Sequence, residues 1–494
     1  MSQVLDLIKD RVLTFEQKVV ALARAGEATL NVLNITDEVQ DYRDKGIICD
    51  LFEGNAPYRP RYIVPNYSIF MEKGCSFLRL DPPTNIWEAT NHLLIFYKHV
   101  PSITTMPVYV GNLDALLDPF IVDEEEAYQA IKLFFIHLDR TITDSFCHGN
   151  LGPTDSKAAR IILKVQRELQ DAVPNLTLKF NEDTSKELAT LAINTAMACA
   201  KPSFANHDMF TKDLGDYGIV SCYNGLPIGG GSHSLVRLVL SRLAEEADSV
   251  DHFLTTVLPD ATARICHYMD QRVKFLVEES GFFESHFLVK EGFISKDKFT
   301  SMFGLVGLAE CVNVLLDATD KKDRFGHNKE ADALGLEIIK TLQKLVDAHP
   351  APYCTNERYL LHAQVGIDTD IGVSPGCRIP VGEEPEIHQH LIQSAPFHQY
   401  FPSGIGDIFV FDETAEVNPE YVLDIIKGSF TAGLRYFSLY GSDVDVMRIT
   451  GYLVKKSDME ALAKGEQVLH DTVVLGLGGV NNNKVLERKV RNHD

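Results

Sequence analysis

Helix-like and strand-like segments alternate along this chain from residue 155 onward, and this pattern constrains the fold most. Alternation of this kind is typical of α/β folds, in which helices cover a largely parallel sheet. With 494 residues, of which 45% are apolar, the chain can form one large α/β barrel with appendages, or two to three domains. The periodicity predicts helices over 155–172, 185–200 and 232–247, the last capped by Ser232, and strands over 176–180 and 218–222.

Composition excludes several classes of protein. The net charge of −22 argues against binding to nucleic acid or to an anionic membrane surface. No apolar window of about 18 residues is present, so we expect no transmembrane helix. The N-terminus lacks the basic and apolar regions of a signal peptide, which predicts a cytoplasmic protein. Nine cysteines without a Cys-x-x-Cys pair indicate reduced thiols, not disulfides or a zinc site.

A C-terminal unit is predicted over 413–494, after a core over 1–412 that begins with a helical region. The sequence Asn418-Pro419-Glu420 has the features of a helix start, namely a capping side chain, a proline and an acid. Apolar residues then follow at helical spacing, at Val422, Ile426, Phe430, Gly433 and Phe437. This helix precedes and presents the segment that carries the most specific motif of the chain.

That motif is Arg448-Ile449-Thr450-Gly451-Tyr452-Leu453. A backbone α-radical is stabilised by delocalisation into the flanking amides, which requires a flattened α-carbon. A side chain would hinder that geometry, and glycine alone has no Cβ. The tail that follows, with Asn481-Asn482-Asn483-Lys484 and the charged run 487–491, is also part of the pattern. Arg448 is expected to hold the loop by ion pairing, with Asp443 and Asp445 its nearest acids in sequence.

The motif resembles the signature of glycyl radical enzymes, and further segments extend the resemblance. Segment 105–114 looks like an early barrel strand and loop, 303–310 like a glycine-rich strand and helix start, and 353–356 like a late strand. Together with the tail 475–482, the chain looks most like the uncharacterised YjjI-type family, related to anaerobic ribonucleotide reductases and pyruvate formate-lyases. The resemblance implies a ten-stranded α/β barrel of two parallel half-sheets with helices outside.

Enzymes of this type pass the radical to a cysteine in a tight loop, and two cysteines qualify here. Cys222 lies in a run rich in turn residues, 220–231, after a strand-like segment. Cys377 lies in Gly376-Cys377-Arg378, which looks like the cysteine loop of the reductases but comes late in the chain. Chain order favours Cys222. A buried cysteine that only fills space is the alternative for either.

Departures from the related families leave the reaction open. Pyruvate formate-lyases use two adjacent cysteines, but Ser221 and Tyr223 flank Cys222 here. The diol and amine eliminases carry a glutamate general base where this chain has Asn224. The zinc-binding cysteines and the ATP-sensing region of the reductases are not evident. The alternatives are activity like that of an anaerobic ribonucleotide reductase or a formate acetyltransferase, a nucleotide-type or deoxyribose-type enzyme without a radical, or a catalytically silent binding relative.

Other polar groups are weaker candidates. The glycines of 225–231 form either a phosphate loop or a loop that allows close approach to Gly451. Glu384, Glu386, His388, His390 and His398 form either a metal site, with His388 and His390 on one face of a strand, or a solvated polar loop, which we favour. We expect no bound metal. Candidates for substrate binding or loop support are Asn224, His233, Glu310, Asn356, Cys377, Arg448 and Tyr452, with His148 and Glu357 as further possibilities.

The resemblance implies a mechanism with a separate partner. A radical S-adenosylmethionine activating enzyme abstracts hydrogen from Gly451, the radical moves to Cys222, and the thiyl takes hydrogen from a small polar metabolite. No cofactor is permanently bound, because the radical is a post-translational modification of the chain itself. The barrel excludes solvent and oxygen, so the enzyme works anaerobically. A homodimer is also implied.

Overall fold

The structure, a computed structural model, describes most of the chain. The described residues are 2–51, 53, 55–102, 107–143, 146–364, 369–449, 451–471, 473, 478, 484–488 and 490. Residues 105–106 of the predicted early strand, Thr450 of the glycine motif, and positions 475–477 and 479–483 of the tail lie outside this set.

Strands in the described part of the chain form two five-stranded sheets and two two-stranded ribbons. In the first sheet β8, β9 and β10 are parallel, and β1 and β2 pair antiparallel with β8. Its strands are β1 (Ile48–Cys49), β2 (Tyr62–Val64), β8 (Gly230–Val239), β9 (Phe299–Val306) and β10 (Leu360–Ala363).

The second sheet has the order β11-β12-β5-β4-β3. Strands β3, β4 and β5 are parallel, β11 and β12 are parallel, and β12 meets β5 antiparallel. Its strands are β3 (His148–Leu151), β4 (Asn175–Phe180), β5 (Ser203–Asn206), β11 (Asp407–Phe411) and β12 (Tyr436–Gly441). These central strands are buried along their whole length, as expected for a sheet covered on both faces.

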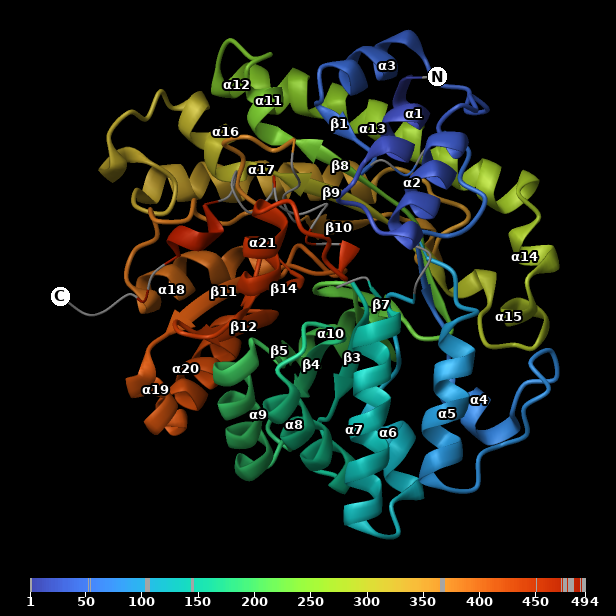
Figure 1. The fold of residues 1–494 in the computed structure, drawn as a ribbon. Helices are drawn as coiled ribbons and strands as arrows, with labels where there is room; N and C mark the ends of the chain where they lie inside the picture. Colours follow the sequence, from blue (N-terminus) through green and yellow to red (C-terminus); the bar gives the residue numbers. More distant parts are fainter. Residues whose placement is uncertain are drawn as a thin grey trace.

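Helices lie outside the two sheets (Figure 1). The helices along the second sheet are α7 (Glu124–Thr141), α8 (Lys157–Leu169), α9 (Lys186–Cys199) and α20 (Pro419–Ala432); those along the first are α11 (Leu240–Ala244), α13 (Leu258–Lys274), α16 (Leu308–Leu315) and α17 (Lys329–Asp347). The N-terminal helices are α1 (Ser2–Lys9), α2 (Phe15–Glu27) and α3 (Asp37–Asp44). In Figure 1 the C-terminal segment, with β14 and α21, lies at the centre of the molecule between the two halves.

Most of the predicted alternation is confirmed. The predicted helices over 155–172 and 185–200 are α8 and α9, and the predicted strand over 176–180 is β4. Ser185 caps α9 by accepting from the backbone nitrogen of Leu188. The strand of 303–310 is the end of β9, and α16 begins directly after Gly307.

The predicted helix over 232–247 is wrong. Residues 230–239 are β8, and only the short helix α11 follows. An apolar run such as Leu235 to Leu240 suits a buried strand as well as a helix, and periodicity does not separate the two. The strand forms because β8 is the central member of its sheet, paired with β1 and β2 on one side and β9 on the other.

Three further expectations need correction. Residues 353–356 are not a strand, because 355–357 is a 3-10 turn in which Asn356 has φ of +59°; the late strand is β10. Described residues 107–112 run beside β3, bonded through Val110 N to His148 O at 2.9 Å, but form no regular strand, and α6 (Leu113–Leu117) follows. Asn418 begins α20 without a side-chain cap bond, and Phe437 belongs to β12.

The predicted boundary at residue 412 stays a prediction. The second sheet runs across it, because β11 ends at Phe411 and pairs with β12. Beyond β12 the chain forms β13 (Val446–Arg448), β14 (Leu453–Lys455) and α21 (Lys456–Ala463). Residues of these elements, such as Leu453 and Met459, share an apolar cluster with Ile408 and Val410 of β11 and Tyr440 of β12.

Candidate active site

Cys222 lies at the tip of a β-hairpin. Strands β6 (Tyr217–Val220) and β7 (Asn224–Pro227) pair antiparallel, with Val220 opposite Asn224, which leaves residues 221–223 as a three-residue loop. Ser221 takes φ of +58°, the left-handed conformation that such a tight connection requires of one residue. Cys222 is 2% exposed, so the hairpin carries its thiol into the protein interior.

Gly451 lies at the tip of a second hairpin. Strands β13 and β14 pair with Arg448 opposite Leu453, and the backbone nitrogen of Ile449 donates to the carbonyl of Tyr452 at 3.1 Å. The Tyr452 ring turns toward Phe146, with 5.1 Å between ring centroids. Gly451 is therefore presented at the end of a closed turn and is itself buried.

The two hairpin tips touch. A Cβ atom built onto Gly451 would lie 2.0 Å from Cβ of Cys222, 3.0 Å from its Sγ and 3.2 Å from its Cα. No real side-chain carbon approaches another atom this closely, so position 451 accepts only glycine in this arrangement. Gly404 has a related role behind the cysteine loop, because its φ is +133° and an added Cβ would lie 2.2 Å from the carbonyl oxygen of Tyr223.

A chain of buried hydrogen bonds holds the cysteine loop from β3, β4 and β12. His148 Nδ1 donates to the carbonyl of Ser221 at 3.0 Å, so its Nε2 accepts from the Thr177 hydroxyl at 2.8 Å. Thr177 in turn accepts from the Tyr436 hydroxyl at 2.7 Å, whose oxygen lies 3.3 Å from the carbonyl oxygen of Cys222. Burial lowers the pKa of His148 to about 3, which keeps the ring neutral with one proton to donate.

Asn175 connects the arginine and the glycine of the motif. Arg448 Nη2 donates to Oδ1 of Asn175 at 3.0 Å, and Nδ2 of Asn175 donates to the carbonyl of Gly451 at 3.1 Å. The predicted ion pair of Arg448 is wrong: no carboxylate pairs with it among the described residues, and Asp445 instead accepts from Ser457. The guanidinium is buried, and burial lowers its pKa to about 10, which leaves it charged at neutral pH.

The Cys222 thiol is positioned as a neutral hydrogen donor. Burial raises its pKa, so the sulfur keeps its hydrogen at neutral pH. Sγ donates to Oδ1 of Asn224 at 3.7 Å. Asn224 therefore contacts the thiol, as its candidate role requires, and its Nδ2 is buried without a hydrogen-bond partner in the described part of the chain.

Other predicted residues lie elsewhere. His233 is on β8, where Nε2 bonds the carbonyl of Tyr353 at 3.0 Å and the ring stacks on Phe299. Asn356 is exposed in its turn. Cys377 is buried, and burial raises the pKa of its thiol well above the usual value.

The glycines of 225–231 are explained by close packing against segments other than the one that carries Gly451. Cβ atoms at Gly230 and Gly231 would lie 1.9 Å from the carbonyl oxygen of Lys298 and 2.0 Å from that of Tyr62. These glycines therefore admit neighbouring backbone against β8. Neither the phosphate-loop interpretation nor close approach to Gly451 is supported at these positions.

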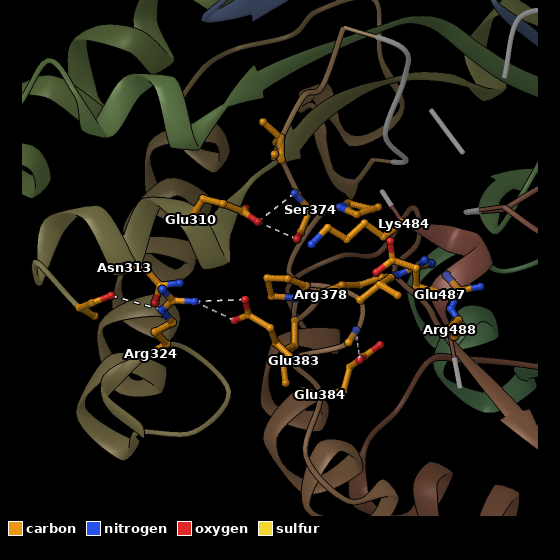
Figure 2. Close-up of a pocket in the computed structure, with 18 of the residues that line it drawn as sticks. Glu310, Asn313, Arg324, Ser374, Arg378, Glu383, Glu384, Lys484, Glu487 and Arg488 are labelled. Atoms are coloured by element: carbon orange, nitrogen blue, oxygen red, sulfur yellow. Dashed lines mark hydrogen bonds and ion pairs between the residues drawn. The ribbon is translucent and has the colours of Figure 1, made fainter. Parts of the chain in front are cut away.

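A surface pocket of about 710 Å³ has Arg378 and Ile449, the residue that follows β13, in its lining (Figure 2). Glu310 lies in its wall and accepts from the backbone nitrogen and the hydroxyl of Ser374, at 3.1 and 2.7 Å. Arg378, Asp407 and Ile449 are among the buried residues that line it. In the view of Figure 2, Glu310 and Arg324 lie on one side of Arg378, and the C-terminal residues Lys484, Glu487 and Arg488 on the other.

The histidines considered as metal ligands do not converge. They lie on helix α18 (Ile387–His398), not on a strand, so His388 and His390 point in different directions. His390 pairs with Asp407 at 2.7 Å, while His388 lies 3.4 Å from Glu386. Within the described ranges no group of three or more His, Cys, Asp or Glu side chains is arranged to hold a metal ion. The described helices include none with the length and apolar character needed to cross a bilayer.

Comparison with known families agrees with this geometry. The family model described as "Glycyl radical enzyme YjjI-like" matches residues 13–491. The chain belongs to the YjjI-like glycyl radical enzyme family. Within this family it is 46% identical to an uncharacterised protein of Haemophilus influenzae, over 99% of this chain and 98% of the relative. It is 42% identical to the uncharacterised protein YjjI of Escherichia coli, over 98% and 95%.

Solved structures show the same fold at low identity. The anaerobic ribonucleotide reductase of Thermotoga maritima, in complex with dATP and CTP, has a TM-score of 0.70 and 14% identity, covering 94% of this chain and 88% of that one. Hydroxyproline dehydratase of Clostridioides difficile has a TM-score of 0.70 and 11% sequence identity, and the match covers 100% of this chain and 88% of the dehydratase. The B12-independent glycerol dehydratase of Clostridium butyricum has a TM-score of 0.69 and 11% sequence identity, and the match covers 97% of this chain and 86% of that one. The predicted glycyl radical enzyme fold is confirmed, and the protein is an enzyme of that family.

Five residues of the site escaped the sequence analysis as functional groups. Asn175 and Thr177 are polar residues within β4, a strand that is buried along its whole length. Polar residues in a buried strand need hydrogen-bond partners, so their presence was a signal that could have been used. Arg378 stands in the Gly376-Cys377-Arg378 motif, which was noted only for its cysteine, and Tyr436 and Arg61 have no comparable local signal. They reach the site only through folding.

Proposed function

We propose that Gly451 stores the radical and that Cys222 carries it to substrate as a transient thiyl. The observation that carries this proposal is the contact of the two hairpin tips, in which an added Cβ at Gly451 would overlap Cys222. The α-carbon radical takes the hydrogen atom from the sulfur of Cys222, which leaves a thiyl and an intact glycine. The thiyl then takes a hydrogen atom from a C–H bond of the substrate, and the reverse transfers restore both residues.

The surroundings of Cys222 suit this chemistry. A protonated thiol is the form that donates a hydrogen atom, and burial holds Cys222 in that form. The supporting hydrogen bonds fix the loop position without contacting the sulfur, so they leave it available to the glycine on one side and to substrate on the other. Asn224 is a neutral partner of the thiol, which favours hydrogen-atom transfer over base catalysis at this position.

The remaining parts of the proposal follow from the family. A separate radical S-adenosylmethionine activating enzyme generates the radical, no cofactor stays bound, and the substrate is a small polar metabolite. The enzyme works anaerobically in the cytoplasm as a homodimer. Ser221, in the place of a second cysteine, argues against acetyl transfer.

The test is anaerobic activation by an activating enzyme, followed by electron paramagnetic resonance. Protein labelled with [2-¹³C]glycine is expected to show added ¹³C splitting of the radical signal, which identifies a glycine α-carbon without mutation. Exposure to air is then expected to cleave the chain at residue 451, read by mass spectrometry of the fragments. A signal without ¹³C splitting, or cleavage at another glycine, would contradict the assignment.

A further inference from the structure

Three buried arginines interact electrostatically with Cys222, and they come from separate parts of the chain. Arg61 precedes β2, Arg378 lies in the loop before α18, and Arg448 ends β13. Their exposed fractions are 9%, 9% and 0%. Burying a guanidinium is costly unless acceptors or opposite charges surround it. We therefore compare, for each arginine, the acceptors and carboxylates that offset its buried charge.

Arg448 is the least balanced of the three. Its Nη2 donates to Asn175, but Nε and Nη1 are buried and have no hydrogen-bond partner among the described residues. Arg448 interacts electrostatically with Arg378, unfavourably, and with Cys222. A buried cation with two unused donors beside another cation is the situation in which a bound anion stabilises a site.

Arg378 extends from the pocket of Figure 2 to the cysteine loop. Its Cζ lies 5.7 Å from the ring centroid of Tyr223, and its Nε donates to the carbonyl of Gly406 at 2.8 Å. Its Nε also lies 3.9 Å from Asp407, which pairs more closely with His390 at 2.7 Å. Arg378 therefore brings a positive charge from the pocket wall to the side of the cysteine loop.

Arg61 shares its carboxylate partner. It pairs with Glu53, and Glu53 also accepts from Nη2 of Arg272 at 2.6 Å. Nε of Arg61 is buried without a partner. The positive charges of Arg61 and Arg378 both act on Cys222, against the burial that raises the pKa of its thiol.

Several buried polar atoms in the region of Cys222 have no hydrogen-bond partner in the described part of the chain, and four of them share one chemical property. They are Nε and Nη1 of Arg448, Nε of Arg61 and Nδ2 of Asn224. All four are hydrogen-bond donors, and three belong to cations. A ligand that satisfies them must supply acceptors and negative charge.

We propose that the substrate of Cys222 carries an anionic oxygen group, a carboxylate or a phosphate, bound between Arg378 and Arg448 with Asn224 as an additional donor. This inference rests on the proposed function, because it assigns the substrate class of the same site. The anionic group anchors one end of the molecule and holds a neighbouring C–H bond at the sulfur of Cys222. The reacting carbon is then close to the carboxylate or phosphate.

Calorimetric titration of the non-activated protein tests this binding directly. The probes are inorganic phosphate and malonate, with glycerol as the neutral control, each at constant ionic strength in chloride. Wild-type protein is expected to bind one of the two anions and not glycerol. The anion that binds with higher affinity shows whether the site prefers a phosphate or a carboxylate. Arg378→Gln is expected to weaken that binding by about tenfold or more, since it removes a charge-assisted hydrogen bond.

Two further variants make the outcome decisive. Arg264→Gln removes the same charge from α13, where Arg264 pairs with Asp260 at 2.8 Å, and is expected to leave anion affinity unchanged. Asn224→Asp keeps every arginine and the side-chain shape, but places a carboxylate beside Cys222, and is expected to weaken anion binding by about tenfold or more. This variant decides the matter if Arg378→Gln does not fold.

The contrary outcomes are distinct. No anion binding by wild-type protein, or equal affinity in wild type and Asn224→Asp, which would indicate an adventitious ion only, overturns the inference. Radical formation at Gly451 without anion binding would leave the proposed function intact and remove only the substrate class. Anion binding without any radical after activation would leave the anion site intact and remove the proposed radical function.

Discussion

The side-chain amide of Asn175 donates to the carbonyl oxygen of Gly451 at 3.1 Å, across 276 positions of sequence. The same side chain accepts from Arg448 at 3.0 Å, so one asparagine at the start of β4 holds both ends of the glycine turn. Backbone bonds within the hairpin close the turn, but Asn175 ties it to the large sheet. The position of Gly451 against Cys222 thus depends on a residue far away in sequence.

Replacing Asn175 by alanine is expected to destabilise the protein by about 2 kcal/mol or more, because it leaves a buried carbonyl and a buried guanidinium nitrogen without a partner. Urea unfolding measures the change. Asn418→Ala is the matched control and is expected to stay within about 0.5 kcal/mol of wild type, since Asn418 makes no side-chain cap bond. Equal effects of the two substitutions would show that Asn175 does not anchor the turn.

Gly451→Ala is expected to destabilise the protein by about 1–3 kcal/mol, in addition to removing the radical, because the methyl group overlaps Cys222. Gly428→Ala is the control. Gly428 lies within α20 with no atom within 4 Å of an added Cβ, so alanine there is expected to stabilise the protein by about 0.5–1 kcal/mol. Thermal unfolding of both variants checks the opposite signs.

Cys222→Ser is expected to retain the glycyl radical but to block its exchange with solvent hydrogen. In the proposed transfer, the glycine α-hydrogen passes reversibly to a thiol whose hydrogen exchanges with water. Activated wild-type protein moved into D₂O is therefore expected to lose the doublet splitting of its resonance, and Cys222→Ser to keep it. Cys377→Ser is expected to behave as wild type, and loss of exchange in that variant instead would transfer the role to Cys377.

Arg488→Ala is expected to loosen the glycine hairpin. Its guanidinium donates to the carbonyls of Arg448 at 3.1 Å and Ile449 at 3.4 Å. In the proposed function an activating enzyme reaches the buried Gly451, so loss of these bonds is expected to accelerate radical formation and trypsin cleavage within 446–455. Slower activation with unchanged proteolysis would show that Arg488 has another role.

Stability is expected to be highest near pH 6.5 and to fall on either side. Burial lowers the pKa of four histidines, to about 3 for His148, His362 and His398 and to about 4 for His233. The unfolded chain binds these protons below about pH 6.5 and the folded chain does not. The free energy of unfolding therefore decreases as the pH falls below about 6.5, by about 1.4 kcal/mol per pH unit for each histidine.

Two groups act in the opposite direction. Burial raises the pKa of Asp114 to about 6, which offsets part of the loss between about pH 4 and 6. Hydrogen bonds to Asp139 and Asp458 outweigh burial and raise the pKa of His470 to about 9, so its contribution is complete below about pH 6.5 and is lost as the pH rises to about 9. Urea unfolding at several pH values measures this curve, and His470→Gln is expected to flatten its alkaline side. A flat profile between pH 6.5 and 5 would contradict the burial of neutral histidines.

The sequence by itself determined the parts of this protein that depend on local chemistry. The proposed radical function requires a glycine, which has no Cβ, and a cysteine in a tight loop. Both candidates, in Arg448–Leu453 and in the turn-rich run around Cys222, can be identified from neighbouring residues. Helices such as α9 and strands such as β4 were predictable because spacing and caps act over a few residues.

Tertiary structure decided everything that depends on contacts between distant segments. The run that forms β8 reads equally well as a helix, and it is a strand because β1, β2 and β9 pair with it. Arg448 binds Asn175, not its sequence neighbour Asp445, and Tyr436 reaches the carbonyl of Cys222 across 214 positions. Local pattern carries no information about such pairs, because burial and hydrogen bonding at a site are satisfied by whichever residues the folded chain brings within reach.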